Sequence, residues 1–278
     1  MKPFNIKGKG RHYPHPIHGE AKPLPSVTNI LGAYPKQLFL TPWAAKKQNE
    51  LACEKSAEVY EWAVARRITD GKQFARELEA HIGKERKHKT EFERAGEIGT
   101  KVHGAIEFFI KNQMGLPCEE PETLEGEAMH SYMAFDDFWF QARPRPLYSE
   151  LFVWNDTDEH AGTTDLVAEI EITKDLVSRI NSRFKDPRVA GFIGQTVRAD
   201  IDFKTSTGIY ADTMLQLAAY LDSLEKMSIL GNEAWGMVVR LPKDGEKWEV
   251  AFLHPDDRAK KYEAFMAVKR VWEDMHGA

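Results

Sequence analysis

An aspartate and a lysine two residues apart are the most chemically suggestive feature of the sequence. Asp202 and Lys204 end a run, residues 197–204, whose alternating apolar residues are typical of a β-strand. Residues two apart in a strand share a face, so the carboxylate and the ammonium project together. Such a pair is compatible with an ordinary surface ion pair. It is also compatible with a metal ligand beside a lysine that positions or helps to activate water.

A second acid, Asp165, favours the metal-site interpretation. Asp165 follows Gly162-Thr163-Thr164 and lies in another expected strand, residues 162–172. Two carboxylates brought together from neighbouring strands repel each other unless a cation lies between them. Carboxylate oxygens suit Mg²⁺ or Mn²⁺ better than zinc. The sequence therefore predicts a site for one or two Mg²⁺ or Mn²⁺ ions.

Other polar side chains have spacings that place them beside such a site. His103 lies in a helix expected over about residues 97–112, and Glu150 in an alternating segment, residues 148–154. Gln216 and Tyr220 are four residues apart in a predicted amphipathic helix, so they share a face. Taken singly, each of these residues is more typical of packing or of a solvated surface.

The order of these residues along the chain resembles a known family. The matching elements are Gly99-x-x-x-His103, Glu150, Gly162-Thr163-Thr164-Asp165, Asp202-Phe203-Lys204-Thr205-Ser206 and Gln216-Leu217-Ala218-Ala219-Tyr220. They resemble the RecB-type exonuclease branch of the PD-(D/E)XK nuclease superfamily. The segment from Pro25 to Leu31 is also similar to phage-type members and to relatives of the mitochondrial genome maintenance exonuclease.

The resemblance implies roles for individual residues. Asp165 and Asp202 match the metal-binding acids, and His103 matches a histidine that adds a metal ligand. Lys204 matches the catalytic lysine. The resemblance assigns three further residues to the catalytic group. Glu150 matches an acidic position on the first strand. Gln216 and Tyr220 match a motif that orients the lysine and contacts DNA.

The resemblance also implies a fold and an activity. The expected fold is α/β, with a restriction-endonuclease-like PD-(D/E)XK core, a mixed central sheet flanked by helices, and a helical N-terminal half. The expected activity is metal-dependent exonuclease cleavage of DNA from strand ends, in recombination, repair or replication. A structure-specific or restriction-type endonuclease on the same core, and a catalytically silent nucleic-acid-binding module, remain alternatives.

The period of the pattern changes along the chain and divides it. Residues 1–40 are rich in Pro, Gly and His and predict extended structure and turns. Helical patterns follow, and alternation typical of strands begins at about residue 148. We expect an N-terminal extended segment and helical subdomain over residues 1–95, and the nuclease core over residues 96–278.

Two groups of basic residues are candidate phosphate contacts, although such groups are usually solvated surfaces. One lies between predicted helices and comprises Lys84, Arg86, Lys87 and Lys89. The other lies in an insertion, residues 173–196, and comprises Arg179, Arg183 and Lys185. The helical spacing of Leu176, Val177 and Ile180 predicts a short helix in the insertion. Because Asp165 and Asp202 flank the insertion, we expect it to emerge beside them. A solvent-exposed embellishment is the alternative.

Composition excludes several other classes of protein. A net charge of −5 argues against a nonspecific basic DNA coat. The two cysteines are too few to hold an iron–sulfur cluster by thiolates alone. The sequence has no Walker A loop, so no nucleotide cofactor is expected and unwinding would need a helicase or single-strand-binding partner. With no apolar segment of spanning length and no signal peptide, we expect no membrane association and a cytoplasmic location in a bacterial or phage-infected cell. Polarity, strand preference and oligomeric state are left open.

Overall fold

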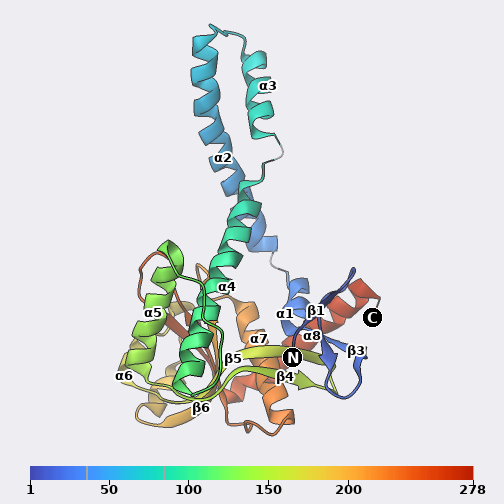
Figure 1. Cartoon of the computed structure of the whole chain (residues 1–278), viewed down its shortest axis with the longest axis vertical. Helices are drawn as coiled ribbons and strands as arrows, with labels where there is room; N and C mark the ends of the chain where they lie inside the picture. Colours follow the sequence, from blue (N-terminus) through green and yellow to red (C-terminus); the bar gives the residue numbers. More distant parts are fainter. Residues whose placement is uncertain (36, 84, 278) are drawn as a thin grey trace. The chain divides into compact units, whose positions relative to one another are not determined.

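The computed structural model describes residues 1–35, 37–83 and 85–277, with the side chains of residues 37–39 left out. The chain divides into two compact units (Figure 1). The larger unit comprises Met1–Tyr34 and Ile98–Ala278, and the helical unit comprises Pro35–Glu97. The expected division fell at residues 95 and 96, close to the second of these boundaries. Residues 1–34, which the sequence grouped with the helices, belong instead to the larger unit.

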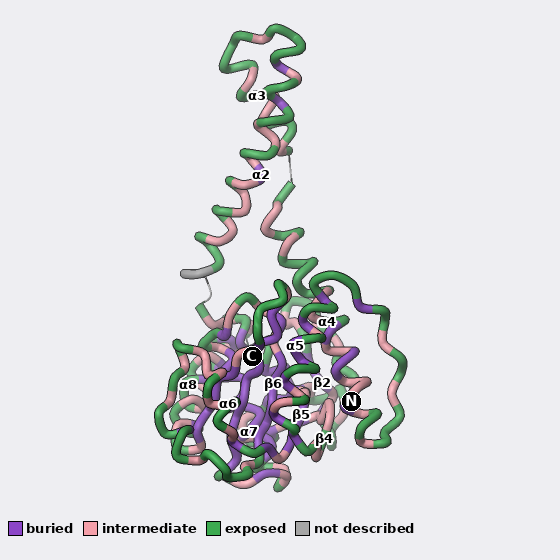
Figure 2. The backbone as a smooth tube through the Cα atoms, turned by 90° about the vertical axis from the view of Figure 1, so that its left-hand side faces the viewer, coloured by how far each residue is buried: buried purple, intermediate pink, exposed green. Residues whose placement is uncertain are grey.

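The helical unit contains α2 (Gln37–Ala65), α3 (Gly71–Ile82) and the first turns of α4 (Lys87–Gln113). Asp70 caps α3 by accepting a hydrogen bond from the backbone N–H of Lys72. Helix α4 begins ten residues earlier than the sequence predicted, because its glycines at 96 and 99 weaken a helix without ending it. The buried apolar residues of this unit among the described ones are Leu51, Val59 and Ala63. The exposed colouring of α2 and α3 in Figure 2 reflects this small core.

A five-stranded mixed sheet forms the centre of the larger unit, which confirms the predicted mixed α/β class. Its strands are β4 (Arg145–Asn155), β5 (His160–Glu171), β6 (Thr196–Lys204), β7 (Trp235–Arg240) and β8 (Glu249–Leu253), in that spatial order. Strands β4, β5 and β6 are antiparallel neighbours, β6 and β7 are parallel, and β7 and β8 are antiparallel. The parallel pair requires a crossover, which α7 (Ala211–Lys226) supplies.

Helices cover both faces of this sheet, and alternation along β6 decides which residues face which helices. Phe203 and its odd-numbered neighbours pack in one hydrophobic cluster with α4 and α5 (Gly126–Ala142). On the opposite face, α7 and α8 (Pro255–His276) pack in a second cluster, which includes Val167 and Val238 of the sheet. The even-numbered residues of β6, including Asp202 and Lys204, project toward the α7 face.

The N-terminal segment packs on the same unit through a second, three-stranded antiparallel sheet. This sheet consists of β1 (Phe4–Ile6), β2 (Gly10–His15) and β3 (Gly19–Pro25), and the short helices α1 (Val27–Ile30) and η1 (Leu31–Ala33) follow it. Ser26 caps α1 by accepting a hydrogen bond from the N–H of Asn29, and it also bridges to Ala161 of β5. These contacts explain why residues 1–34 belong with the larger unit.

The insertion between β5 and β6 corrects one expectation. It forms the predicted short helix, α6 (Lys174–Ser178), followed by η2 (Ser182–Phe184) and η3 (Pro187–Phe192). However, it leaves the sheet where Glu171 pairs with Thr196, about 20 Å along β5 from Asp165 at ~3.3 Å per residue. Antiparallel pairing puts the connection at one end of the two strands and the two aspartates toward the other. The insertion then runs to β8, where the N–H of Asn181 donates to the carbonyl of Val250.

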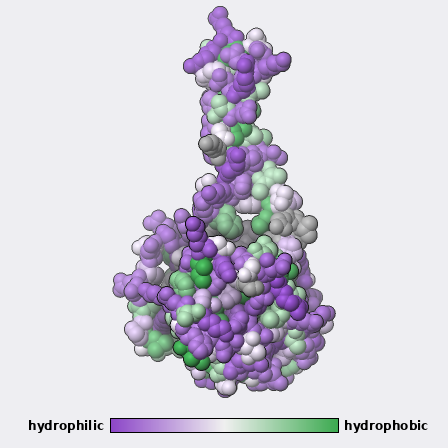
Figure 3. Space-filling model, turned by 90° about the vertical axis from the view of Figure 1, so that its right-hand side faces the viewer, coloured by the Kyte–Doolittle hydropathy of each residue, from purple (hydrophilic) through white to green (hydrophobic). Residues whose placement is uncertain are grey.

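The surface is mostly polar. On the face drawn in Figure 3, hydrophilic side chains predominate and hydrophobic ones form small separate areas, as on most folded proteins. Within the described ranges, no helix combines the length and the apolar character needed to cross a membrane.

Gly162 of β5 offers a test of how α7 is seated on the sheet. A methyl group at this position would overlap the ring of Tyr220 on α7. We expect Gly162→Ala to lower the free energy of unfolding by roughly 1–3 kcal/mol, because the helix must shift to accommodate it. Thermal and urea unfolding would measure this.

Gly104 provides the matched control, because a methyl group there would meet no atom within 4 Å. Since Gly104 lies inside α4, Gly104→Ala should stabilise the protein by about 0.5–1 kcal/mol. Equal effects of the two substitutions would contradict the close contact between Gly162 and Tyr220.

Candidate metal centre

The sheet forks at the position of the two aspartates. Backbone pairing between β5 and β6 ends at Leu166 and Ile201, whereas β6 continues to pair with β7 as far as Lys204. At the fork, Oδ2 of Asp165 accepts a hydrogen bond of 2.8 Å from the backbone N–H of Phe203. A side-chain carboxylate thus replaces the strand carbonyl that would otherwise pair with β6, and this holds Asp165 beside the end of β6.

Strand β5 changes face at the same point. Leu151 of β4, in the α7-side cluster, pairs with Thr164, so Thr164 also faces α7. Val167, three residues later, again faces α7, whereas regular alternation would turn it away. Asp165 lies within this irregularity, and its carboxylate is therefore directed into the fork.

Glu150 marks the matching irregularity in β4. Ser149 pairs with Leu166 and Leu151 with Thr164, which leaves Glu150 opposite Asp165. The φ angle of Glu150 is +49°, a left-handed conformation that costs a residue with a side chain about 1–2 kcal/mol. Local departures from regular strand geometry redirect side chains and are common beside functional sites. Here the departure brings Glu150 next to Asp165.

These two acids form a compact group with His103 of α4. One potential ligand atom from each of the three residues lies within 4.8 Å of the others. Nδ1 of His103 is 3.6 Å from Oδ2 of Asp165. Ligand atoms on opposite sides of one Mg²⁺ or Mn²⁺ are separated by about 4–5 Å, twice the usual ligand distance. Two carboxylates and one imidazole at this spacing therefore fit a single divalent cation.

The electrostatics of the group point the same way. Burial, together with the neighbouring Asp165 and Glu107 carboxylates, raises the pKa of Glu150 to about 8. Burial acts to raise the pKa of Asp165, but His103, Lys204 and the hydrogen bond from the Phe203 N–H together outweigh it and leave that pKa lowered. Burial likewise opposes protonation of His103, yet Asp165 leaves its pKa raised. A divalent cation would relieve the repulsion between the carboxylates.

Asp202 makes its contacts on the other side of the fork. Its side chain is 4% exposed, and Nζ of Lys204 lies 2.7 Å from both of its oxygens. Nε2 of Gln216 donates to Oδ1 of Asp202 at 2.9 Å. The structure thus brings together Asp202, Lys204 and Gln216, and it groups His103, Glu150 and Asp165 separately, joined to them through the Asp165–Phe203 hydrogen bond.

Lys204 is held as an ammonium ion. Burial lowers its pKa, but the Asp202 and Asp165 carboxylates more than offset this and raise it. Burial raises the pKa of its partner Asp202 to about 6, although Lys204 opposes the shift. A lysine that keeps its proton donates hydrogen bonds and positive charge, so it is suited to hold a water molecule or an anionic oxygen rather than to remove a proton.

Tyr220 lies one turn beyond Gln216 on α7 and is 3% exposed. Its ring rests on Gly162, and burial raises the pKa of its hydroxyl well above the usual value. In this structure Tyr220 packs α7 against β5, next to the residues that carry the acids.

The basic residues of the helical unit have partners within that unit. Lys87 forms ion pairs with Glu50 and Glu54, and Lys89 lies 3.8 Å from Glu93. The guanidinium of Arg86 donates to the carbonyl of Glu85. Lys84 lies outside the described residues.

The basic residues of the insertion differ among themselves. The side chain of Arg179 is 18% exposed, lies over the ring of Trp248 and is 3.8 Å from Asp137. Its backbone carbonyl also accepts a hydrogen bond from the N–H of Val250, so Arg179 anchors the insertion to β8 and α5. Arg183 and Lys185 are exposed.

Sequence reasoning missed one acid, Asp200, which is fully buried on β6. Oδ1 of Asp200 accepts a hydrogen bond from the hydroxyl of Thr164. Burial, and less strongly the Asp202 and Asp165 carboxylates, raise its pKa well above the ordinary value. The available signal was the spacing: Asp200 is two residues before Asp202 and shares its face of the strand.

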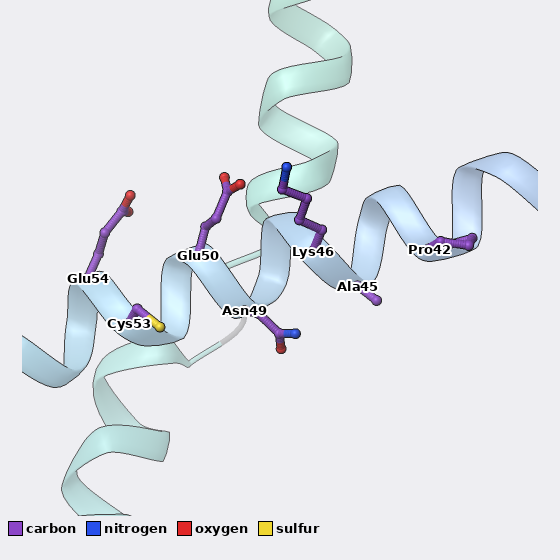
Figure 4. A pocket seen from close by; sticks show the side chains of 7 residues that line it. All are labelled: Pro42, Ala45, Lys46, Asn49, Glu50, Cys53 and Glu54. Atoms are coloured by element: carbon purple, nitrogen blue, oxygen red, sulfur yellow. The ribbon is translucent and has the colours of Figure 1, made fainter.

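A hollow elsewhere in the chain has no comparable chemistry. It follows one side of α2 and is lined by Pro42, Ala45, Lys46, Asn49, Glu50, Cys53 and Glu54 (Figure 4). All seven residues come from one helix, and Glu50 is already paired with Lys47 and Lys87. The group at the sheet fork remains the stronger candidate site.

Compared with models of known protein families and with the sequences of curated proteins, the chain matches neither a family nor a relative.

The crowding of acids predicts a pH-dependent cost to stability. Because the folded protein raises the pKa of Glu150 from 4.5 to about 8, its ionisation favours unfolding as pH rises through that interval. Glu150→Gln should therefore stabilise the metal-free protein, little at pH 4.5 and increasingly up to pH 8. Urea unfolding at several pH values would measure the difference.

Glu169 on β5 provides a control of opposite sign. Hydrogen bonds and charge from Arg145 and Arg198 lower the pKa of Glu169. Glu169→Gln should destabilise the protein at neutral pH, and that effect should vanish as pH falls below the ordinary carboxyl range. If Glu150→Gln destabilised the protein at pH 8, the proposed crowding of acids would be contradicted.

Proposed function

We propose that the chain is a Mg²⁺- or Mn²⁺-dependent nuclease with a PD-(D/E)XK core that hydrolyses DNA phosphodiester bonds from strand ends. The observation that carries this proposal is the close grouping of His103, Glu150 and Asp165 at a fork in the sheet. The Asp202–Lys204 pair lies at the end of the adjoining strand. The order of these residues in the sequence, and their resemblance to the RecB-type branch, supply the choice of nuclease chemistry.

The donor set fits the proposed cofactor. His103, Glu150 and Asp165 would hold the ion, and Asp202 is one hydrogen-bonded step away across the fork. When bound, such an ion polarises a phosphate and makes water more acidic. Carboxylate oxygens dominate the set, which favours Mg²⁺ or Mn²⁺ over softer metals.

The chain's own residues supply orientation and charge. Lys204 presents an ammonium group that is able to hold the attacking water or to stabilise negative charge on the phosphate. Gln216 and Lys204 both bind Asp202 and so fix the orientation of its carboxylate. Glu150, with its pKa raised to about 8, would give up a proton when a cation binds, so metal affinity should increase with pH.

Metal dependence is the first test of the proposed activity. With end-labelled linear DNA, hydrolysis should require Mg²⁺ or Mn²⁺ and should stop when EDTA is added. The paired variants Asp165→Asn and Asp202→Asn should lose hydrolysis in both metals. Full activity of the metal-stripped protein would contradict the assignment.

Closed circular single-stranded DNA separates the alternative activities. An exonuclease should leave it intact while degrading the linear form. Cleavage of the circle would indicate an endonuclease on the same core, and DNA binding without cleavage in either metal would indicate a silent binding module.

Lys204→Ala should reduce kcat by about 10²–10³-fold while leaving DNA affinity largely unchanged, because the ammonium acts on charge that develops in the transition state. Single-turnover rates and filter binding would separate the two quantities. Lys226→Ala, an exposed lysine on α7, should match the parent. Since Asp202 loses its ion pair in Lys204→Ala, thermal unfolding must show that the variant is folded. A parallel loss of DNA affinity would make Lys204 a phosphate anchor.

A further inference from the structure

Asp200 is a buried acid for which the proposed reaction has no direct use. It is 0% exposed and lies between the buried residues Ala199 and Ile201 of β6. Oδ1 accepts the hydrogen bond from Thr164, and Oδ2 has no hydrogen-bond partner among the described residues. A buried polar atom without a partner costs about 1–3 kcal/mol, so an apolar residue would serve packing better.

The location of Thr164, which donates this hydrogen bond, suggests what Asp200 does. Thr164 immediately precedes Asp165, in the part of β5 that has already separated from β6. Two side-chain hydrogen bonds continue the contact there: Thr164 to Asp200 and the Phe203 N–H to Asp165. The first hydrogen bond fixes Thr164, and the second fixes the carboxylate of Asp165. Together they hold this part of β5 in place where the two strands separate.

We propose that Asp200, acting through Thr164, is a positioning residue that fixes the Asp165 carboxylate at the fork and so sets the geometry of the metal site. This inference rests on the proposed function for the identity of the site. Asp200 itself would not touch the ion, because its side chain is fully buried and, among the described residues, it is not part of the compact ligand group. Residues that orient a metal ligand typically change metal affinity by about 10–100-fold when they are replaced.

Four substitutions separate positioning from other roles. Thr164→Val removes the hydroxyl at nearly constant volume, and Thr164→Ser restores a hydroxyl. Asp200→Ala removes the acceptor, and Asp200→Asn keeps an oxygen acceptor without the charge. Asp222→Asn is the control, because Asp222 is a half-buried acid that accepts a hydrogen bond from Asn155, away from the metal group.

The first measurement needs no metal. In the metal-free protein, amide hydrogen exchange of Phe203 reports its hydrogen bond to Asp165. Exchange should accelerate in Thr164→Val and Asp200→Ala, and it should stay close to that of the parent in Thr164→Ser, Asp200→Asn and Asp222→Asn. Unchanged exchange in both Thr164→Val and Asp200→Ala would overturn the inference, and Thr164→Val keeps the test decisive if Asp200→Ala does not fold.

The second measurement is Mn²⁺ affinity by titration calorimetry. Thr164→Val and Asp200→Ala should bind Mn²⁺ about 10–100-fold more weakly, with Asp200→Asn close to the parent. If Asp200→Asn lost as much affinity as Asp165→Asn, Asp200 would be a ligand and the positioning role would be wrong. If the parent protein bound no Mn²⁺ while Phe203 exchange responded as expected, the proposed function would fail and the link from Asp200 to Asp165 would stand.

Discussion

The hydrogen bond from the Phe203 N–H to Asp165 is the contact on which the candidate site depends. Where β5 and β6 separate, the backbone groups of β6 on that side lose their partners, and an unpaired buried N–H is costly. Asp165 removes that cost and is itself held in place. The same contact joins the group around His103 to the Asp202–Lys204 pair, so one hydrogen bond connects strand pairing with the chemistry of the site.

Several features of the candidate site are unfavourable for the folded protein. Glu150 has a left-handed backbone and a raised pKa, and Asp200 buries an oxygen without a partner among the described residues. Each feature lowers the free energy of unfolding relative to an apolar residue in regular strand geometry. The large apolar clusters on both faces of the sheet compensate for it. This distribution, in which local cost is concentrated where side chains converge, is typical of functional sites.

The sequence predicted the mixed α/β class. Its alternating apolar residues also predicted a strand in which Asp202 and Lys204, two residues apart, share one face. Local periodicity is enough for such features. It could not show that β5 reverses its face at Asp165 or that Glu150 adopts a positive φ, because both depend on pairing between strands distant in sequence. The path of the insertion was missed for the same reason. Although Asp165 and Asp202 flank the insertion in sequence, the antiparallel ladder between β5 and β6 separates it from them in space. The spacing of Asp200 and Asp202 predicts that they share a face of β6. It does not predict that Asp200 is fully buried, which is what distinguishes it from an ordinary strand residue.

The two ends of the sheet differ in how they could meet another chain. At β8 the insertion covers the edge, with Asn181 donating to Val250 and Arg179 accepting from it. The opposite edge is β4, which is irregular in three ways. Pro146 has no N–H, the register shifts beside it, and Glu150 has a left-handed backbone conformation. An edge interrupted in this way is a poor template for another strand. The irregularity at Glu150 therefore also makes the β4 edge less suited to pairing with a strand of another chain.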